Sequence, residues 1–335
     1  MSLAMAEASV PPPPPGLWVP SITLFSPSDT LDLASQSLYF QYLSQPSTGL
    51  SGLLVLGTNG EPFLLTREER SSLLHLARKT VPPGFPIMAG VSGHSTAQVR
   101  EFISDAQAAG ADYVLVLPCA YFGAKPSVVE GFFREVSQYV RQLGRERGKE
   151  MGVVIYNFPG VTNGVDMDSE MISRIVKENS NVVGVKLTCG SVAKVTRLAA
   201  EFGRGRFSVF GGQSDFLIGG LSVGSAGCVA AFGNVFPRVI GRVYRLWKEG
   251  RTEEALELHR KAALGEQKLK ALGVAGTKLA AGIFTGVKAG VVKEGELEGV
   301  EGRFRMRAPY EALGRGESER IWEGLRGLDE VEKGL

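Results

Sequence analysis

A regular alternation of short apolar segments with amphipathic ones constrains the fold more than any other feature of this sequence. The apolar segments read as strands, and helix-type segments with apolar residues at three- and four-residue spacing separate them. Continuous apolar strands are typical of a parallel sheet that is covered on both faces. The pattern predicts a (β/α)8 TIM barrel. The expected strands are residues 17–25, 53–56, 86–91, 113–117, 153–156, 182–187, 207–210 and 228–231.

A doubly wound open sheet is the rival architecture for alternating strands and helices. That fold commonly carries GxGxxG after its first strand, and no such motif follows residue 25. Capping signals support the individual helices. Thr66 with Glu69 three residues later predicts a capping box, and Asp29 is expected to cap a helix that ends at Leu43.

The sequence changes character after Phe232. Residues 237–250, 252–272, 276–289 and 317–332 read as helices with no strand between them, and the Gly- and Glu-rich residues 290–304 read as a loop. We therefore expect a catalytic barrel over residues 17–235 and a helical C-terminal domain over 236–335. Residues 1–16 contain five consecutive prolines and are expected to form a disordered leader.

Composition argues against several classes of partner. The formal net charge is only +2 and the basic residues are scattered, which disfavours nucleic acid. No apolar run approaches the roughly 20 residues of a membrane span. The three histidines are far apart, so no metal-ligand spacing is visible. Three cysteines without a CxxC motif indicate reduced thiols, and a leader without arginine argues against a transit peptide, so a cytoplasmic location is expected.

Two of the strand-type segments end in ionisable residues, Tyr156 and Lys186. Active sites of such barrels lie at the C-terminal ends of the strands, and the fifth and sixth strands are neighbours. Desolvation there would lower the pKa of a lysine, as imine formation requires, and a phenol could move protons for it. The alternative is a snorkelling lysine beside a buried core tyrosine.

A third group of polar residues follows the second strand. The turn Gly57-Thr58-Asn59-Gly60 offers backbone N–H groups, a hydroxyl and an amide, a combination that suits a small anion such as a carboxylate. The alternative is an ordinary turn between a strand and a helix.

Several motifs together resemble the dihydrodipicolinate synthase / N-acetylneuraminate lyase family of class I, pyruvate-dependent aldolases. GTNGE at Gly57–Glu61 is similar to that family's carboxylate-binding loop. YNFPG at Tyr156–Gly160 resembles its tyrosine motif, and GVKLTCG at Gly184–Gly190 resembles its Schiff-base lysine strand. GGQSD at Gly211–Asp215 and FGNVFP at Phe232–Pro237 extend the resemblance over nearly the whole barrel.

The resemblance implies a role for each matching residue. Lys186 would form the imine with the ketone of a pyruvate unit, and Tyr156 would shuttle protons. Thr58 and Asn59, with the backbone of Gly57, would bind the pyruvate carboxylate, and Thr58 would relay protons to Tyr156. This chemistry needs neither metal nor organic cofactor, because the protonated imine accepts the electrons of the breaking C–C bond.

Two further assignments come from the same resemblance. Val229 matches an aliphatic residue beside the pyruvate, although a plain core valine is the alternative. Tyr121 matches a tyrosine that family members supply across a subunit contact, or it is a loop aromatic packed at such a contact. The resemblance also implies a homotetramer built as a dimer of dimers.

One departure from the family pattern narrows the range of possible substrates. Related synthases carry an arginine two residues after the proline of the tyrosine motif, where this chain has Val161, which cannot bind a second carboxylate. Asn59 is similar to the 4-hydroxy-2-oxoglutarate aldolases, our leading hypothesis, although no cation for that substrate's distal carboxylate is identified. The YNFPG motif also resembles fungal aldolases of 2-keto-3-deoxy sugar acids, the second hypothesis. Dihydrodipicolinate synthesis is a third hypothesis, and a catalytically silent binding protein is a fourth.

Overall fold

The computed structural model describes residues 8–335, and its sheet confirms the predicted TIM barrel. Eight strands close in chain order from β1 to β8, and the recorded strand pairs are parallel. The strands are β1 (Gly16–Pro20), β2 (Leu50–Val55), β3 (Ile87–Gly90), β4 (Tyr113–Val116), β5 (Gly152–Asn157), β6 (Val182–Leu187), β7 (Ser208–Gly211) and β8 (Gly227–Val229).

One α-helix lies between each strand and the next, as the alternation predicts. The first helix begins later than expected, because Asp32 and not Asp29 caps it. The capping box of Thr66 and Glu69 is present at the start of the second helix. The helices are α1 (Leu33–Leu43), α2 (Arg67–Thr80), α3 (Thr96–Ala108), α4 (Pro126–Arg147), α5 (Ser169–Glu178), α6 (Val192–Phe202) and α7 (Leu217–Ser222).

Contacts group the chain into two compact units that do not follow the boundary predicted at Phe236. Of the described residues, the first unit combines 8–15 with Pro86–Gly212 and Gly219–Cys228. The second combines Gly16–Phe85, Gln213–Ile218 and Val229–Leu335. The division into a barrel domain and a helical domain stays a prediction.

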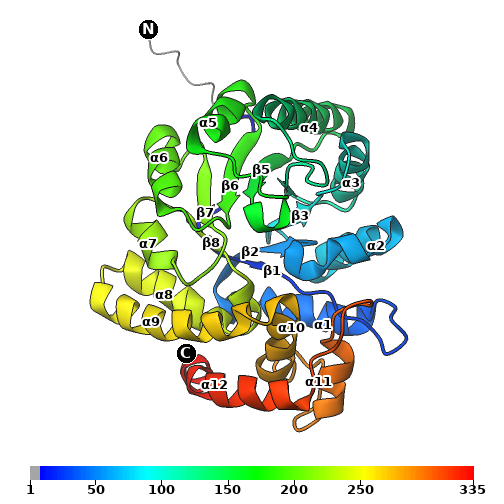
Figure 1. Ribbon diagram of the computed structural model, residues 1–335, viewed down its shortest axis with the longest axis vertical. Coiled ribbons are helices and arrows are strands. Elements are labelled where there is room, and N and C mark those ends of the chain that lie inside the picture. The colour runs from blue at the N-terminus through cyan, green and yellow to red at the C-terminus, as the bar shows by residue number, and fades with distance from the viewer. Residues whose placement is uncertain (1–7) are drawn as a thin grey trace. The chain divides into compact units, whose positions relative to one another are not determined.

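In the first unit, α3, α4, α5 and α6 pack in sequence along one side of strands β3–β7 (Figure 1). Each of these strands is buried along its whole length, which explains its continuous apolar sequence. Helix α5 buries Met171, Ile172, Ile175 and Val176 on one face. This is the apolar stripe of a helix that covers a sheet.

The Pro-rich segment is bound to the first unit where the structure describes it. Ser9 N donates to Ser180 O at 3.2 Å, Tyr113 Oη to Pro12 O at 3.4 Å, and Ser208 Oγ to Pro13 O at 2.7 Å. Proline lacks an N–H, but its carbonyl remains a hydrogen-bond acceptor. These contacts differ from the predicted disordered leader, whose residues 1–7 lie outside the described chain.

The C-terminal helices belong to the second unit. They are α8 (Pro237–Lys248), α9 (Thr252–Lys270), α10 (Gly273–Phe284), α11 (Leu297–Arg303) and α12 (Arg315–Gly334). Helix α9 contacts α8, α10 and α12, and α10 also contacts α11 and α12 (Figure 1). The expected loop over residues 290–304 is wrong where α11 forms. Buried Val300 and Phe304 attach that helix closely to α10, since a Cβ at Gly282 would lie 2.7 Å from Val300 Cγ1.

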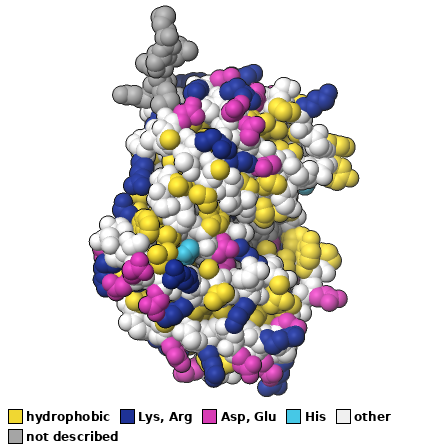
Figure 2. Space-filling view, turned by 60° about the vertical axis from the view of Figure 1, so that its left-hand side comes forward, with side chains coloured by type: hydrophobic (Ala, Val, Ile, Leu, Met, Phe, Trp, Pro, Cys, Tyr) yellow, Lys and Arg dark blue, Asp and Glu magenta, His cyan; other side chains and the backbone are white. Residues whose placement is uncertain are grey.

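Figure 2 shows Lys and Arg side chains interspersed with Asp and Glu over the visible face. Within residues 8–335, no helix combines the length and the hydropathy that a membrane span requires.

Candidate active site

Lys186 and Tyr156 lie against each other at the ends of two neighbouring strands. They are paired positions in the register of β5 and β6. Lys186 Nζ is 4.3 Å from the centroid of the Tyr156 ring, within the range of a cation–π contact. Lys186 is 2% exposed and Tyr156 is 3% exposed. The structure therefore brings together a buried amine and a phenol, the two groups that imine chemistry needs side by side.

The backbone around this pair is fixed by continuous strand pairing. Val154 pairs with Gly184 and Ile155 with Val185, and Thr188 N donates to Asn157 O at 3.0 Å just beyond Lys186. A Cβ at Gly184 would lie 3.0 Å from Ser208 O, so the next strand approaches closely. Buried, hydrogen-bonded strands hold a reactive side chain more precisely than a loop does.

The loop that leaves Tyr156 is fixed by Asn157, a residue for which the motifs predict no role. Its fully buried amide donates from Nδ2 to Asp166 Oδ1 at 2.7 Å and accepts from Met167 N at 2.9 Å. Asp166 is also paired with Lys194 of α6. The sequence signal for this role of Asn157 is an amide side chain at the end of an apolar strand, because a buried amide must find hydrogen-bond partners.

Gly212 follows β7, and the backbone there passes close to Thr188, the residue two positions after Lys186. Its N–H donates to Leu187 O at 3.0 Å, and a Cβ would lie 2.0 Å from Thr188 Oγ1 and 2.6 Å from Thr188 Cα. The second contact is with backbone, so rotation of a side chain cannot relieve it.

We expect Gly212→Ala to lower the free energy of unfolding by about 1–3 kcal/mol, the usual cost of overpacking. The measurement is urea unfolding followed by circular dichroism. Gly205→Ala is the matched control, because a Cβ at Gly205 meets nothing within 4 Å. Equal stability of the two variants would contradict the predicted clash.

The Gly57–Glu61 turn follows β2 and belongs to the second unit. Thr58–Gly60 forms a 3-10 turn in which Gly60 N donates to Gly57 O at 2.8 Å. A Cβ at Gly57 would lie 2.8 Å from Leu54 Cδ2, so this position is suited to glycine. Thr58 and Asn59 are half-buried. They belong to the second unit, whereas Lys186 and Tyr156 belong to the first.

The other predicted site residues differ in exposure. Val229 ends β8 and is fully buried, which also fits a plain core valine. Tyr121 lies in the loop after β4, is 75% exposed and contacts the rings of His94 and Phe122 edge-on. Val161 lies in the short turn Pro159–Val161 and is exposed.

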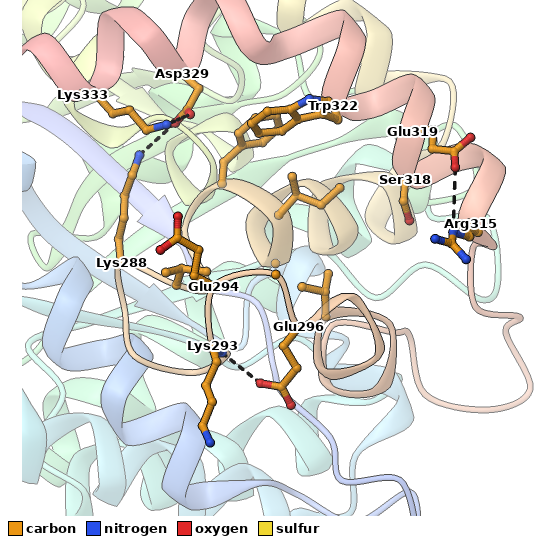
Figure 3. Close-up of a pocket in the computed structure, with 16 residues that line it drawn as sticks. Lys288, Lys293, Glu294, Glu296, Arg315, Ser318, Glu319, Trp322, Asp329 and Lys333 are labelled. Atoms are coloured by element: carbon orange, nitrogen blue, oxygen red, sulfur yellow. Dashed lines mark hydrogen bonds and ion pairs between the residues drawn. The ribbon is translucent and has the colours of Figure 1, made fainter.

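A cavity of about 480 Å³ lies in the second unit between α10, α11 and α12 (Figure 3). The Trp322 ring stacks on Phe284 beside it, and Lys288 and Lys333 both pair with Asp329 (Figure 3). None of the predicted site residues lines this cavity. Among the side chains that the structure describes, no group of three or more His, Cys, Asp or Glu is arranged to hold a metal ion.

Known proteins resemble this chain along most of its length. A Coccidioides immitis protein with the provisional name mitochondrial 4-hydroxy-2-oxoglutarate aldolase is 54% identical over 96% of this chain and 98% of its own. The L-threo-3-deoxy-hexylosonate aldolase of Hypocrea jecorina is 31% identical over the same shares. A crystal structure of a dihydrodipicolinate synthase family protein from Coccidioides immitis has 51% identity and a TM-score of 0.86, covering 97% of this chain and 98% of that one.

The expected cytoplasmic location is wrong. The Coccidioides immitis relative is named as mitochondrial, and so is the provisionally named 4-hydroxy-2-oxoglutarate aldolase of Emericella nidulans, which is 35% identical over 72% of this chain and 76% of its own. The expectation depended on a leader without arginine. Arginine enrichment is a tendency of transit peptides, so its lack in one short segment is weak evidence against import.

The family assignment is supported by both the motifs and the extent of the match. The profile of the Dihydrodipicolinate synthetase family matches residues 14–318. The relatives named as aldolases agree with the prediction that this chain is an enzyme. The chain belongs to the dihydrodipicolinate synthetase family.

Proposed function

We propose that this protein is a class I aldolase that cleaves a 2-oxo acid to pyruvate and an aldehyde through an imine on Lys186. The observation that carries the proposal is the contact of Lys186 with Tyr156, in which Nζ lies 4.3 Å from the ring centroid and both side chains are buried. The family supports the same chemistry. The leading substrate is 4-hydroxy-2-oxoglutarate.

The reaction begins when the neutral amine of Lys186 attacks the ketone carbon C2. Loss of water gives the protonated imine, and Tyr156 carries the protons that this step needs. When the C4 hydroxyl gives its proton to Tyr156, the C3–C4 bond breaks and its electron pair moves toward the iminium. Glyoxylate leaves, and the enamine of pyruvate remains on Lys186. Protonation at C3 and hydrolysis then release pyruvate and the free amine.

The remaining site residues have positioning and binding roles in this proposal. Thr58 and Asn59, with the Gly57 backbone, bind the C1 carboxylate, and Thr58 relays protons to Tyr156. Val229 borders the pyruvate unit. Tyr121 is exposed in the single chain, which fits a residue that acts at a subunit contact. We propose a homotetramer, a dimer of dimers, on the family resemblance. The iminium accepts the electrons, so the proposed cycle needs neither metal nor organic cofactor.

The names of the relatives favour two substrates for this chain. Those from Coccidioides immitis and Emericella nidulans support 4-hydroxy-2-oxoglutarate, and their names support a mitochondrial location. The Hypocrea jecorina aldolase supports a 3-deoxy sugar acid as the second candidate. Val161 disfavours dihydrodipicolinate synthesis, because an apolar side chain cannot form a bidentate contact with a carboxylate.

Two measurements test the proposal. Borohydride reduction with pyruvate is expected to leave a stable adduct on Lys186, identified by peptide mass spectrometry. Pyruvate release is then compared between 4-hydroxy-2-oxoglutarate and 2-keto-3-deoxy sugar acids. We expect kcat/KM to favour the former by at least about tenfold.

The outcomes separate the candidates. No adduct on Lys186 would reject the imine mechanism and favour a silent binding protein. A preference for the sugar acids would replace the leading substrate with the second candidate. Condensation of pyruvate with aspartate semialdehyde as the sole activity would overturn the interpretation of Val161.

A further inference from the structure

A buried ion pair fixes the residue that immediately follows the proposed carboxylate-binding turn. Glu61 Oε1 lies 2.5 Å from Lys278 Nζ of α10, and the two side chains are 1% and 0% exposed. The other carboxylate oxygen, Oε2, accepts the N–H of Arg307 at 2.9 Å. Both oxygens of Glu61 are therefore held by the C-terminal part of the chain.

The backbone of Glu61 requires such support. Its φ of +54° lies in the left-handed region, which a non-glycine residue adopts only at a conformational cost. Glu61 N donates to Thr58 O at 3.1 Å, and Leu64 N donates to Glu61 O at 2.9 Å. Glu61 thus ends the Thr58–Gly60 turn and begins the next one. Its side-chain bonds hold the end of that turn in place.

The surrounding charges form a balanced network. Arg307 pairs with Asp29 and Glu69, and Arg305 also pairs with Asp29. The Lys278 ammonium and the Arg307 guanidinium lie 4.6 Å and 5.3 Å from the centroid of the Phe25 ring. Three cations here face three carboxylates. This balance indicates a structural support for the turn and not a second anion site.

Burial lowers the pKa of Lys278 to about 8, although Glu61 raises it in part. Such a pair adds little to stability by itself, because desolvation of both charges offsets their attraction. A pair of apolar residues could fill the same space at similar stability. Stability alone therefore does not account for this pair, and its position after Thr58 and Asn59 suggests a role at the turn.

We propose that Glu61 is a positioning residue, held by Lys278 and Arg307, that fixes the Thr58–Asn59 turn in the geometry that binds the carboxylate of pyruvate. The inference rests on the proposed function of that turn. According to this inference, substrate binding also depends on helix α10 and on the segment around Arg307. The substrate does not need to touch Glu61 for this dependence to exist.

The test is the pyruvate dependence of borohydride trapping on Lys186 in the full chain. In the double variant Glu61→Leu/Lys278→Met, neither charge is left buried alone, so folding is expected to persist. We expect the pyruvate concentration for half-maximal trapping to rise about tenfold, the scale of one lost charge-assisted hydrogen bond. The trapping rate at saturating pyruvate is expected to fall by a smaller factor than half-saturation rises, because Lys186 and Tyr156 are untouched and only the proton relay through Thr58 is disturbed.

Two further variants sharpen the result. Glu61→Gln keeps an acceptor for Arg307 N but removes the charge, and we expect a smaller rise of about threefold. Lys288→Met is the matched control, since Lys288 follows α10 and pairs with Asp329 instead of Glu61. It is expected to show the wild-type pyruvate dependence.

Each outcome decides between positioning and general stabilisation. Wild-type half-saturation in the folded double variant would overturn the proposal, as would a loss of saturating rate without a change in half-saturation. If the double variant does not fold, Glu61→Gln decides, and an unchanged half-saturation rejects the proposal. Absence of an adduct in the wild-type protein would reject the imine function itself, whereas an adduct with equal pyruvate dependence in all variants would reject only the role of Glu61.

Discussion

Lys186→Ala is expected to abolish the borohydride-stable pyruvate adduct and to lower turnover by a factor on the order of 10⁴–10⁶, as when a covalent nucleophile is removed. The physical reason is that the ketone can no longer form an iminium. Without that electron sink, the C–C bond would have to break toward an unstabilised carbanion. The measurements are trapping with pyruvate and steady-state release of pyruvate from 4-hydroxy-2-oxoglutarate.

Folding must be separated from chemistry in this experiment. Lys186 is buried in β6, so truncation to alanine leaves a cavity beside Tyr156. Lys186→Met retains most of the side-chain volume and is expected to fold with the same loss of activity. Lys177→Ala is the matched lysine control, because Lys177 is exposed and pairs with Glu201 at 2.6 Å. Retained turnover in folded Lys186→Met would show that another lysine carries the reaction.

The barrel could be predicted from the sequence because its strands are covered on both faces. A strand such as Val182–Leu187 is entirely buried, and this leaves a continuous apolar run that differs from the helical spacing around it. Helix α11 could not be predicted in the same way. Gly299 and Gly302 weaken the helical preference of this short segment, and the helix forms where Val300 and Phe304 pack against α10.

The residues of the candidate site likewise divide into those that a sequence pattern predicts and those that no local pattern predicts. Tyr156 and Lys186 could be paired from the sequence, because neighbouring parallel strands end at the same edge of the barrel. Glu61 and Lys278 are separated by 217 positions, and no local pattern links them. A lysine among the small and apolar residues of α10 was the only hint, since a buried lysine needs a partner. The role of Tyr121 could not be derived from one chain either, because the resemblance implies that this tyrosine acts across a contact with another subunit.

Tyr156→Phe is expected to lower kcat by about 10²–10⁴, the usual contribution of a positioned proton-transfer group. The substitution removes only the hydroxyl, so the ring that faces Lys186 Nζ at 4.3 Å remains. We therefore expect the variant to fold and to form the pyruvate adduct slowly. The KM for 4-hydroxy-2-oxoglutarate should change little, because the proposed carboxylate anchor at Thr58 and Asn59 is intact.

Tyr113→Phe is the matched control for this prediction. Tyr113 is a buried tyrosine of the adjacent strand β4, and its hydroxyl donates to Pro12 O at 3.4 Å. Loss of that long hydrogen bond should cost about 1 kcal/mol of stability or less and leave turnover unchanged. If Tyr156 shuttles protons, Tyr156→Phe slows the steps before and after cleavage of the C–C bond. If Tyr156 is only a packing residue, the substitution lowers the free energy of unfolding and leaves kcat normal. Equal kcat in Tyr156→Phe and Tyr113→Phe would therefore assign proton transfer to a group other than Tyr156.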